Sequence, residues 1–295
     1  MAMPGEYDGG RGRGFPVRWV VAAVIALFGI VSFMMRVQTN PVTGERQHVA
    51  MSEQQEMSLG LEAAPKMAAQ MGGDVPSDDL RAREVRRVGN LLVERGDAGR
   101  SPYADNFHFH LLEDPRTINA FALPGGQIFI TLGLFNKLDD EAELAGVLGH
   151  EIGHVIHRHA AQQMAAGQLG QVLTVAAGVG ATDDRGNGRR AQMAAALANQ
   201  MFQLHYSRAD ESQSDAFGLK AMAQAGYDPS AMLDVMKILK AASAGGRTPE
   251  FLATHPLPET RLEAIAQALK QSYPNGIPPD LTRGRSLKGM TGMGD

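Results

Sequence analysis

His150-Glu151-Ile152-Gly153-His154 is the stretch of this sequence that decides the fold, and it lies inside a strongly helical run of residues. Residues four apart lie on the same face of an α-helix, so His150 and His154 can present imidazole nitrogens to one metal ion. Glu151 then lies beside the metal as a base. The pattern predicts a zinc hydrolase site, which the rest of the chain has to complete.

The composition is that of a helix-rich globular protein. The chain has 295 residues, of which 44% are hydrophobic, so it is long enough to enclose a buried site. Its formal net charge is -4, and no basic stripe is interleaved with aromatic residues, which argues against nucleic acid as a partner. It contains no cysteine, which excludes disulfides, thiolate zinc ligands, cysteine nucleophiles and a lipoprotein-type anchor.

The N-terminal part predicts a membrane anchor. Residues 1–17 are rich in glycine and charge and are expected to form a flexible cytosolic tail. Residues 18–36 contain an uncharged run from Trp19 to Met35 that is about 25 Å long as a helix, close to the hydrocarbon core of about 30 Å. A buried core helix would show an amphipathic stripe, and a cleaved signal peptide would have a shorter apolar region and a small-residue cleavage site. A retained single span is therefore our prediction.

Basic residues predict the orientation of this span. Arg11, Arg13 and Arg18 precede it and fewer basic residues follow closely, so the tail should stay in the cytoplasm. We expect a single-pass inner-membrane protein whose catalytic domain is periplasmic or otherwise extracytoplasmic. Residues 37–51 carry turn signals and are predicted to be a linker.

Residues 52–273 are predicted to form the catalytic domain, mainly α with a small β-sheet. Helices are expected over 52–71 and 77–96, the second with Ser77 as its N-cap. Alternating residues at 107–111 predict a strand, and the runs 117–122 and 127–131 around Pro124-Gly125-Gly126 predict a hairpin. This hairpin is either the edge that holds an extended peptide beside the metal or a supporting strand pair.

The second half of the domain is predicted to be helical. The motif helix should begin at Asp139 or Asp140, with Glu143 completing a capping box, and end near His159. Helical pieces around a polar loop at 182–190 are expected over 161–200. Further helices are expected over 191–225, 229–242 and 258–271, and residues 274–295 are expected to be disordered.

Catalytic zinc needs a third protein ligand besides two histidines. One arrangement is H-E-x-x-H-x-x-G-x-x-H, in which a histidine after the motif is the third ligand. It would require glycine at position 157 and histidine at position 160, but the chain has His157 and Ala160 there. A glutamate on a later helix is the other arrangement, and Glu211 fits it. Asp215 lies one turn further on the same face, where it can accept the N–H of a metal-bound histidine.

Several motifs, in order, resemble the HtpX-like and Oma-like zinc metallopeptidases, relatives of the CAAX prenyl proteases. They are HEIGHVIHRH at 150–159, SRADESQSD at 207–215 and THPLPETR at 254–261. The segments NPVTGERQHVAMSEQQEMSLG at 40–60 and NAFALPGGQIFITLGL at 119–134 resemble the periplasmic or lipoprotein branch. The resemblance implies a zincin-like core of the gluzincin type with one Zn²⁺ bound by three residues: His150, His154 and Glu211. It also implies that His255 lies near the metal, where it can occupy or gate the open position. Ser214 departs from the alanine usual in the family.

The expected mechanism is hydrolysis by a zinc-activated water, with Glu151 as general base and then general acid. Tyr206, Arg208 or His255 is expected to stabilise the oxyanion, with His255 ranked first. His157 and His159 are expected to be structural or surface residues, because helical geometry puts His159 off the ligand face. His108 and His110 could be ligands, but an exposed strand face is the preferred interpretation.

The preferred hypothesis is a membrane-anchored zinc endopeptidase acting on misfolded or unassembled envelope proteins, with that substrate class taken from the resemblance. The rival is a chaperone-like assembly factor with a structural or latent zinc site. Prenyl-peptide processing, which would require a membrane chamber of many spans, is disfavoured by the single short span.

Overall fold

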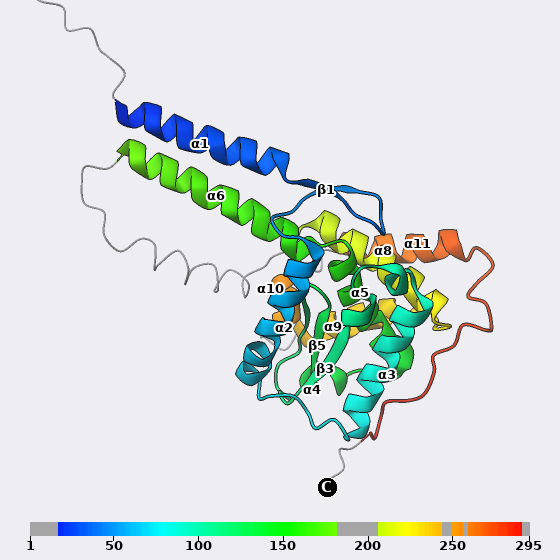
Figure 1. Ribbon diagram of the computed structural model, residues 1–295. Coiled ribbons are helices and arrows are strands. Elements are labelled where there is room, and N and C mark those ends of the chain that lie inside the picture. Colours follow the sequence, from blue (N-terminus) through cyan, green and yellow to red (C-terminus); the bar gives the residue numbers. More distant parts are fainter. Residues whose placement is uncertain (1–16, 182–205, 244–248, 256–258, 291–295) are drawn as a thin grey trace, which may run out of the picture.

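A computed structural model describes residues 17–181, 206–243, 249–255 and 259–290 (Figure 1). It is mainly α-helical with two small sheets, which confirms the predicted fold class. One helix of the described residues, α1 (Val17–Met35), is long and apolar enough to cross a membrane.

The larger sheet has three strands in the order β3-β5-β4, formed by β3 (His108–Leu112), β4 (Ala120–Leu123) and β5 (Gln127–Thr131). β4 and β5 are antiparallel, as the predicted hairpin requires, and β3 pairs with β5 in parallel. Gly125 and Gly126 have φ values of 81° and 114° in the turn, a conformation that favours glycine. Because β5 lies between β3 and β4 in this order, β4 is an edge strand of the sheet.

Helix α5 (Glu141–Ile156), which carries the motif, lies at the centre of the domain, and all of its residues are buried. It contacts α3 (Leu80–Arg95), α8 (Arg208–Gln224), α9 (Ala231–Ser243) and the sheet. Gly153 allows the backbones of α5 and α8 to approach closely, because a Cβ atom at this position would lie 2.9 Å from the Cα of Ser214 on α8. α8 therefore packs directly against the face of α5 that contains the motif.

Shorter or peripheral elements complete the domain. They are α2 (Glu53–Gln70), the 3-10 helices Asp97–Arg100 and Ala104–Asn106, α4 (Leu132–Phe135), α10 (Glu250–Thr254) and α11 (Glu259–Ser272). The predicted N-cap of α3 was wrong: Asp79, rather than Ser77, accepts a hydrogen bond from the N–H of Arg81. The predicted loop at 182–190 and the first part of the helix predicted over 191–225 lie outside the described residues.

The region that we expected to be a linker is an ordered hairpin. β1 (Val37–Thr39) and β2 (Arg46–His48) are antiparallel, and the Asn40 side chain accepts hydrogen bonds from the N–H groups of Val42 and Thr43 in the turn. Asn-Pro and Thr-Gly did signal a turn, but the buried contacts of the hairpin are made with residues more than a hundred positions away.

The motif helix ends earlier than predicted. Asp140 caps its N-terminus as expected, accepting from the N–H of Glu143, but the Glu143 carboxylate accepts from Asp139 rather than completing a strict capping box. At the other end α5 stops at Ile156, Arg158 has a φ of 57°, and α6 (His159–Ala181) starts in a new direction. This break changes where His159 lies.

The expectation of disorder over 274–295 was wrong for residues up to 290. Arg283 and Arg285 form ion pairs with acidic residues at the start of α5, including Glu143 and Glu141, and Leu287 is buried. The segment has few apolar residues, so its order depends on charge pairing that composition alone does not reveal.

Candidate metal centre

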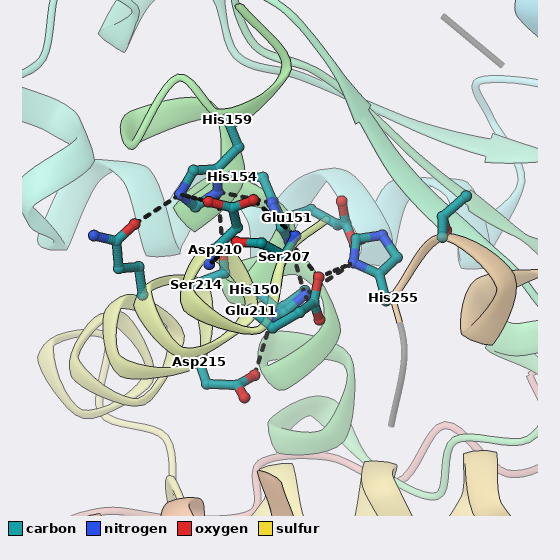
Figure 2. A network of polar contacts seen from close by, with 12 residues as sticks. His150, Glu151, His154, His159, Ser207, Asp210, Glu211, Ser214, Asp215 and His255 are labelled. Carbon is teal, nitrogen blue, oxygen red and sulfur yellow. Dashed lines mark hydrogen bonds and ion pairs between the residues drawn. The ribbon is translucent and has the colours of Figure 1, made fainter. Parts of the chain in front are cut away.

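Four side chains from three segments converge at one buried point (Figure 2). His150 and His154 lie one turn apart on α5, Glu211 lies in the first turn of α8, and His255 follows α10. Each of the four is at most 2% exposed. One potential ligand atom from each lies within 4.8 Å of those of the other three, so these residues can hold a single metal ion.

The distances match a tetrahedral metal site. His150 Nε2 lies 3.1 Å from His154 Nε2, and Glu211 oxygens lie 3.6 and 3.5 Å from these two nitrogens. Ligands about 2.0 Å from zinc in a tetrahedron are about 3.3 Å apart. His255 Nδ1 is 2.9 Å from Glu211 Oε1 and 3.4 Å from His150 Nε2, the position of a possible fourth ligand.

The charge state of the cluster suits a cation. Burial raises the pKa of Glu211, but hydrogen bonding to His154 and His255 outweighs it and holds that pKa well below the usual range. Burial lowers the pKa of His154 strongly. An ionised carboxylate beside a neutral imidazole is the donor set that zinc prefers.

Glu151 lies against this cluster with no hydrogen-bond partner for either carboxylate oxygen among the described residues. His255 lies beside it, with its Nε2 3.7 Å from Glu151 Oε1. Burial raises the pKa of Glu151, since its carboxylate is completely enclosed. A buried carboxylate without partners is costly, and a water molecule held between it and a metal would satisfy it.

Asp215 orients His150. Its Oδ1 lies 3.0 Å from His150 Nδ1, which leaves His150 Nε2 directed into the cluster. Burial lowers the pKa of His150, but the Asp215 hydrogen bond and the charge of Glu211 outweigh it and raise that pKa.

Arg261 is a site residue that the sequence reasoning missed. Its Nε and Nη2 donate to the two Asp215 oxygens at 2.7 and 2.8 Å, and its Nη1 lies 2.5 Å from Glu211 Oε2. Burial raises the pKa of Asp215, but this pairing and the contact with His150 lower it overall. The signal was present, because Arg261 ends the same THPLPETR string that contains His255.

His159, expected to be a structural or surface residue off the ligand face, is buried and is not part of the cluster, but it contacts His154 from the side away from the cluster. Its Nδ1 is 2.9 Å from His154 Nδ1 (Figure 2). Its Nε2 is 2.9 Å from Gln213 Oε1 on α8. If His154 binds metal through Nε2, its Nδ1–H donates to His159, whose Nε2–H donates to Gln213. The break at Arg158 brings His159 back toward α5.

Buried polar side chains fix the end of α5. Asn40 Nδ2 donates to the carbonyl of Ile156 at 2.7 Å, and Gln47 Nε2 donates to that of His157 at 2.8 Å. Arg158 donates to Glu56 Oε1 through Nε at 2.9 Å and to the carbonyl of Met51 at 2.8 Å. These contacts satisfy carbonyls at the end of α5 and hold the positive φ of Arg158.

The remaining predicted residues separate into two groups. Tyr206 is buried with its ring 3.9 Å from that of His154, so it borders the centre. Arg208 is exposed, and His157 pairs with Glu45 at 3.4 Å instead of facing the cluster. On β3, an exposed His108 and a His110 that contacts Asp74 take no part in the metal cluster, as preferred from the sequence.

A groove of about 350 Å³ leads to the centre between α2 and β4. Met67, Met71 and Phe121 contribute apolar side chains, and Tyr206 and His255 lie at its inner end. Asn119, which precedes β4, is 5% exposed, and its Oδ1 has no hydrogen-bond partner among the described residues. No described strand pairs with the outer edge of β4, so the groove runs beside an available strand edge.

A buried helix with two metal-competent histidines, a glutamate on a second helix and an unpartnered carboxylate between them define a metallopeptidase-type site. Comparison with known protein families agrees with this class. Residues 79–269 match the model of peptidase family M48, and the chain belongs to that family.

Curated relatives are peptidases by name. The beta-barrel assembly-enhancing protease of Escherichia coli is 31% identical over 86% of this chain and 53% of its own length. The mitochondrial metalloendopeptidase OMA1 of Schizosaccharomyces pombe is 28% identical over 86% of this chain and 73% of its own length. The human metalloendopeptidase OMA1 is 28% identical over 89% and 53%. The chain thus spans about half the length of several of the curated relatives that it matches.

Proposed function

We propose that this chain is a membrane-anchored zinc endopeptidase in which His150, His154 and Glu211 hold the metal and Glu151 is the general base. The observation that carries the proposal is the convergence of two histidine Nε2 atoms, 3.1 Å apart, on a buried carboxylate beside a second carboxylate without partners. Two imidazole nitrogens at this distance repel unless a proton or a cation lies between them, and a cation satisfies all the groups together.

The residues of the chain divide the chemistry between them. A bound zinc ion would supply the Lewis acidity that polarises the scissile carbonyl and acidifies a water molecule. Glu151 accepts the proton of the attacking water at a carboxylate oxygen and passes it to the nitrogen of the leaving amine. Asp215 and His159 hold the two histidines in the tautomer that directs Nε2 inward. Tyr206 and His255 border the centre as candidate donors to the oxyanion.

The substrate binds as an additional strand. An extended peptide in the groove can pair its main chain with the outer edge of β4 and place apolar side chains against Met67, Met71 and Phe121. The free Oδ1 of Asn119 can accept a main-chain N–H of that peptide. This arrangement selects unfolded or extended polypeptide, since a folded domain does not present a free strand.

The cellular role proposed here is envelope protein quality control. A bacterial relative is named for enhancing β-barrel assembly, and misfolded or unassembled envelope proteins are the corresponding substrates. Helix α1 would hold the enzyme in the inner membrane with residues 1–16 in the cytoplasm and the catalytic domain in the periplasm.

Proteolysis of an unfolded protein by the full chain in detergent or vesicles tests the proposal. We expect cleavage that a zinc chelator stops and added zinc restores, and loss of at least a hundredfold in rate for Glu151→Gln, which keeps the size of the side chain. Glu151→Gln protein that cleaves at the wild-type rate would show that another group is the base.

The chaperone-like alternative is supported by the position of His255, whose Nδ1 lies close enough to the cluster to close the site. Under that alternative the protein binds unfolded clients and cleaves none, with or without His255→Ala. Under the peptidase proposal His255→Ala leaves a metal site that still cleaves, at a rate changed by the loss of the fourth ligand or oxyanion donor. Client binding and cleavage measured on the same samples separate the two.

A further inference from the structure

Helix α6, which follows the metal-binding helix, lies along α1 outside the body of the domain (Figure 1). The two helices are antiparallel. Arg36, at the end of α1, donates to Gln168 Oε1, and further along Gly29 faces Val172. A Cβ atom at Gly29 would lie 2.6 Å from Val172 Cγ1, so the backbone of α1 approaches the side chains of α6 directly.

The surface of this helix pair is apolar on the α1 side. Val24, Leu27 and Phe28 are 60%, 62% and 74% exposed, and α1 has no charged residue between Arg18 and Arg36. An exposed apolar helix surface of this size is unstable in water and is matched by lipid.

The second half of α6 has the same character. Residues 172–181 contain no charged side chain and one hydroxyl, that of Thr174, which donates to the carbonyl of Gly170 at 2.8 Å. Leu173 is 37% exposed and Ala176 is buried. Every side-chain polar group that the structure describes in this half is therefore satisfied within the helix, as a bilayer requires.

The contact between Arg36 and Gln168 lies at the polar boundary of the helix pair, and Gln171, one turn further along α6, is the last side-chain amide of that helix. Beyond Gln171 the ten residues 172–181 of α6 extend about 15 Å beside the apolar length of α1, starting at the contact between Val172 and Gly29. This length is half the thickness of a hydrocarbon core of about 30 Å. A span by α1 necessarily carries this part of α6 to the same depth.

We infer that α6 enters the bilayer beside α1, so that the enzyme is held by a packed pair of helices instead of one flexible anchor. The inference rests on the proposed span by α1. The sequence prediction judged 172–180 too short to span alone, which holds, but partial entry against a spanning helix does not need a full span.

This arrangement fixes the height of the active site above the membrane. α6 starts at His159, the neighbour of His154, and reaches Gln168 after about 15 Å of helix. The β1–β2 hairpin connects the other helix of the pair to the end of α5. The catalytic centre is then held about 15 Å from the lipid surface, a distance that an extended peptide covers with about five residues.

The absence of cysteine from the chain makes single-cysteine labelling a direct test. Three positions on α6 are exposed: Ala166 before the boundary, and Leu173 and Ala177 beyond it. In vesicles containing the full chain, we expect a membrane-impermeant maleimide to label Ala166→Cys at least tenfold faster than Leu173→Cys or Ala177→Cys. All three should react equally after solubilisation in denaturing detergent.

A cysteine at Val24, exposed in the middle of α1, separates failure of the inference from failure of the anchor. If Val24→Cys is protected while Ala177→Cys is labelled as fast as Ala166→Cys, the inference is overturned and the proposed anchor stands. Rapid labelling of Val24→Cys would overturn the proposed span and the inference with it.

A disulfide cross-link tests the packing independently. The Cβ position at Gly29 lies 3.3 Å from Val172 Cβ, near the separation of about 3.5–4.5 Å that a disulfide requires. Mild oxidation of membranes should cross-link Gly29→Cys/Val172→Cys and leave the control Gly29→Cys/Leu173→Cys unlinked. Equal cross-linking of both pairs, or of neither, would contradict the packed pair.

Discussion

Replacement of His159 by phenylalanine tests whether a histidine outside the metal-ligand set controls the metal affinity. His159 is 1% exposed, and its Nδ1 lies 2.9 Å from the ring nitrogen of His154 that faces away from the cluster. Phenylalanine fills the same space but offers no acceptor. If His154 binds the metal through Nε2, its Nδ1–H group would then be a buried donor without a partner.

The size of the effect follows from that unpaired donor. A buried unsatisfied hydrogen-bonding group costs about 1–3 kcal/mol. At about 1.4 kcal/mol for each tenfold change in affinity, His159→Phe should weaken zinc binding by about fivefold to 150-fold. Mutation of groups that orient metal ligands costs about 10–100-fold in other metalloproteins, within the same range.

His157→Phe is the matched control. His157 is two residues away and contacts Glu45, so the same change of residue type removes no partner of a metal ligand. Zinc affinity near neutral pH would be measured by competition with a fluorescent chelator. Wild-type affinity in His159→Phe, or an equal loss in His157→Phe, would refute the role assigned to His159.

Three further predictions concern packing, buried charge and pH. Gly153→Ala should destabilise the protein by about 1–3 kcal/mol in urea unfolding, because the added Cβ would lie 2.9 Å from the backbone of α8. The control Gly146→Ala should be neutral or stabilising, because no neighbour lies closer than 3.6 Å to its Cβ. Arg158→Met should cost about 3–5 kcal/mol because Glu56 is left buried without its counter-charge, although the Tyr103 hydroxyl still donates to it. Adding Glu56→Gln should recover part of that loss, and a double variant no more stable than Arg158→Met would contradict the pairing. Asp79→Ala should cost about 1 kcal/mol at neutral pH through loss of the α3 cap. Hydrogen bonding to Arg81 lowers the pKa of Asp79, so its contribution is complete above the unfolded pKa of about 3.9 and disappears as the pH falls through the lower folded pKa. A difference from wild type that grows on acidification would contradict this sign.

The parts of the site that follow helical spacing could be predicted from the sequence. His150 and His154 share a face of α5 because they are four residues apart, and the same spacing places Asp215 beyond Glu211 on α8. The hairpin of β4 and β5 was equally accessible, because its glycine turn and apolar runs are local features.

The parts that depend on long-range contacts could not be predicted. The position of His159 requires α5 to stop at Ile156, and that stop is held by Arg158 through Glu56 and Met51, more than a hundred residues earlier. The ordered C-terminal segment depends in the same way on Arg283 and Arg285 meeting acidic residues of α5. Local periodicity contains no information about such pairs.

The packing of α6 on α1 also lay beyond sequence reasoning. Hydropathy identifies α1, but α6 taken alone is too short in its apolar part to predict a membrane contact. The approach of Gly29 to Val172 and the contact of Arg36 with Gln168 show that the two helices form a pair.

The zinc content of Glu211→Gln and Glu151→Gln, measured by mass spectrometry beside wild type, tests the central claim most directly. Both variants replace a buried carboxylate by an amide of the same size, but only Glu211 is assigned as a metal ligand. The account predicts about one zinc per chain in wild type and in Glu151→Gln, and much less than one in Glu211→Gln. Full zinc in Glu211→Gln, or zinc loss confined to Glu151→Gln, would contradict it.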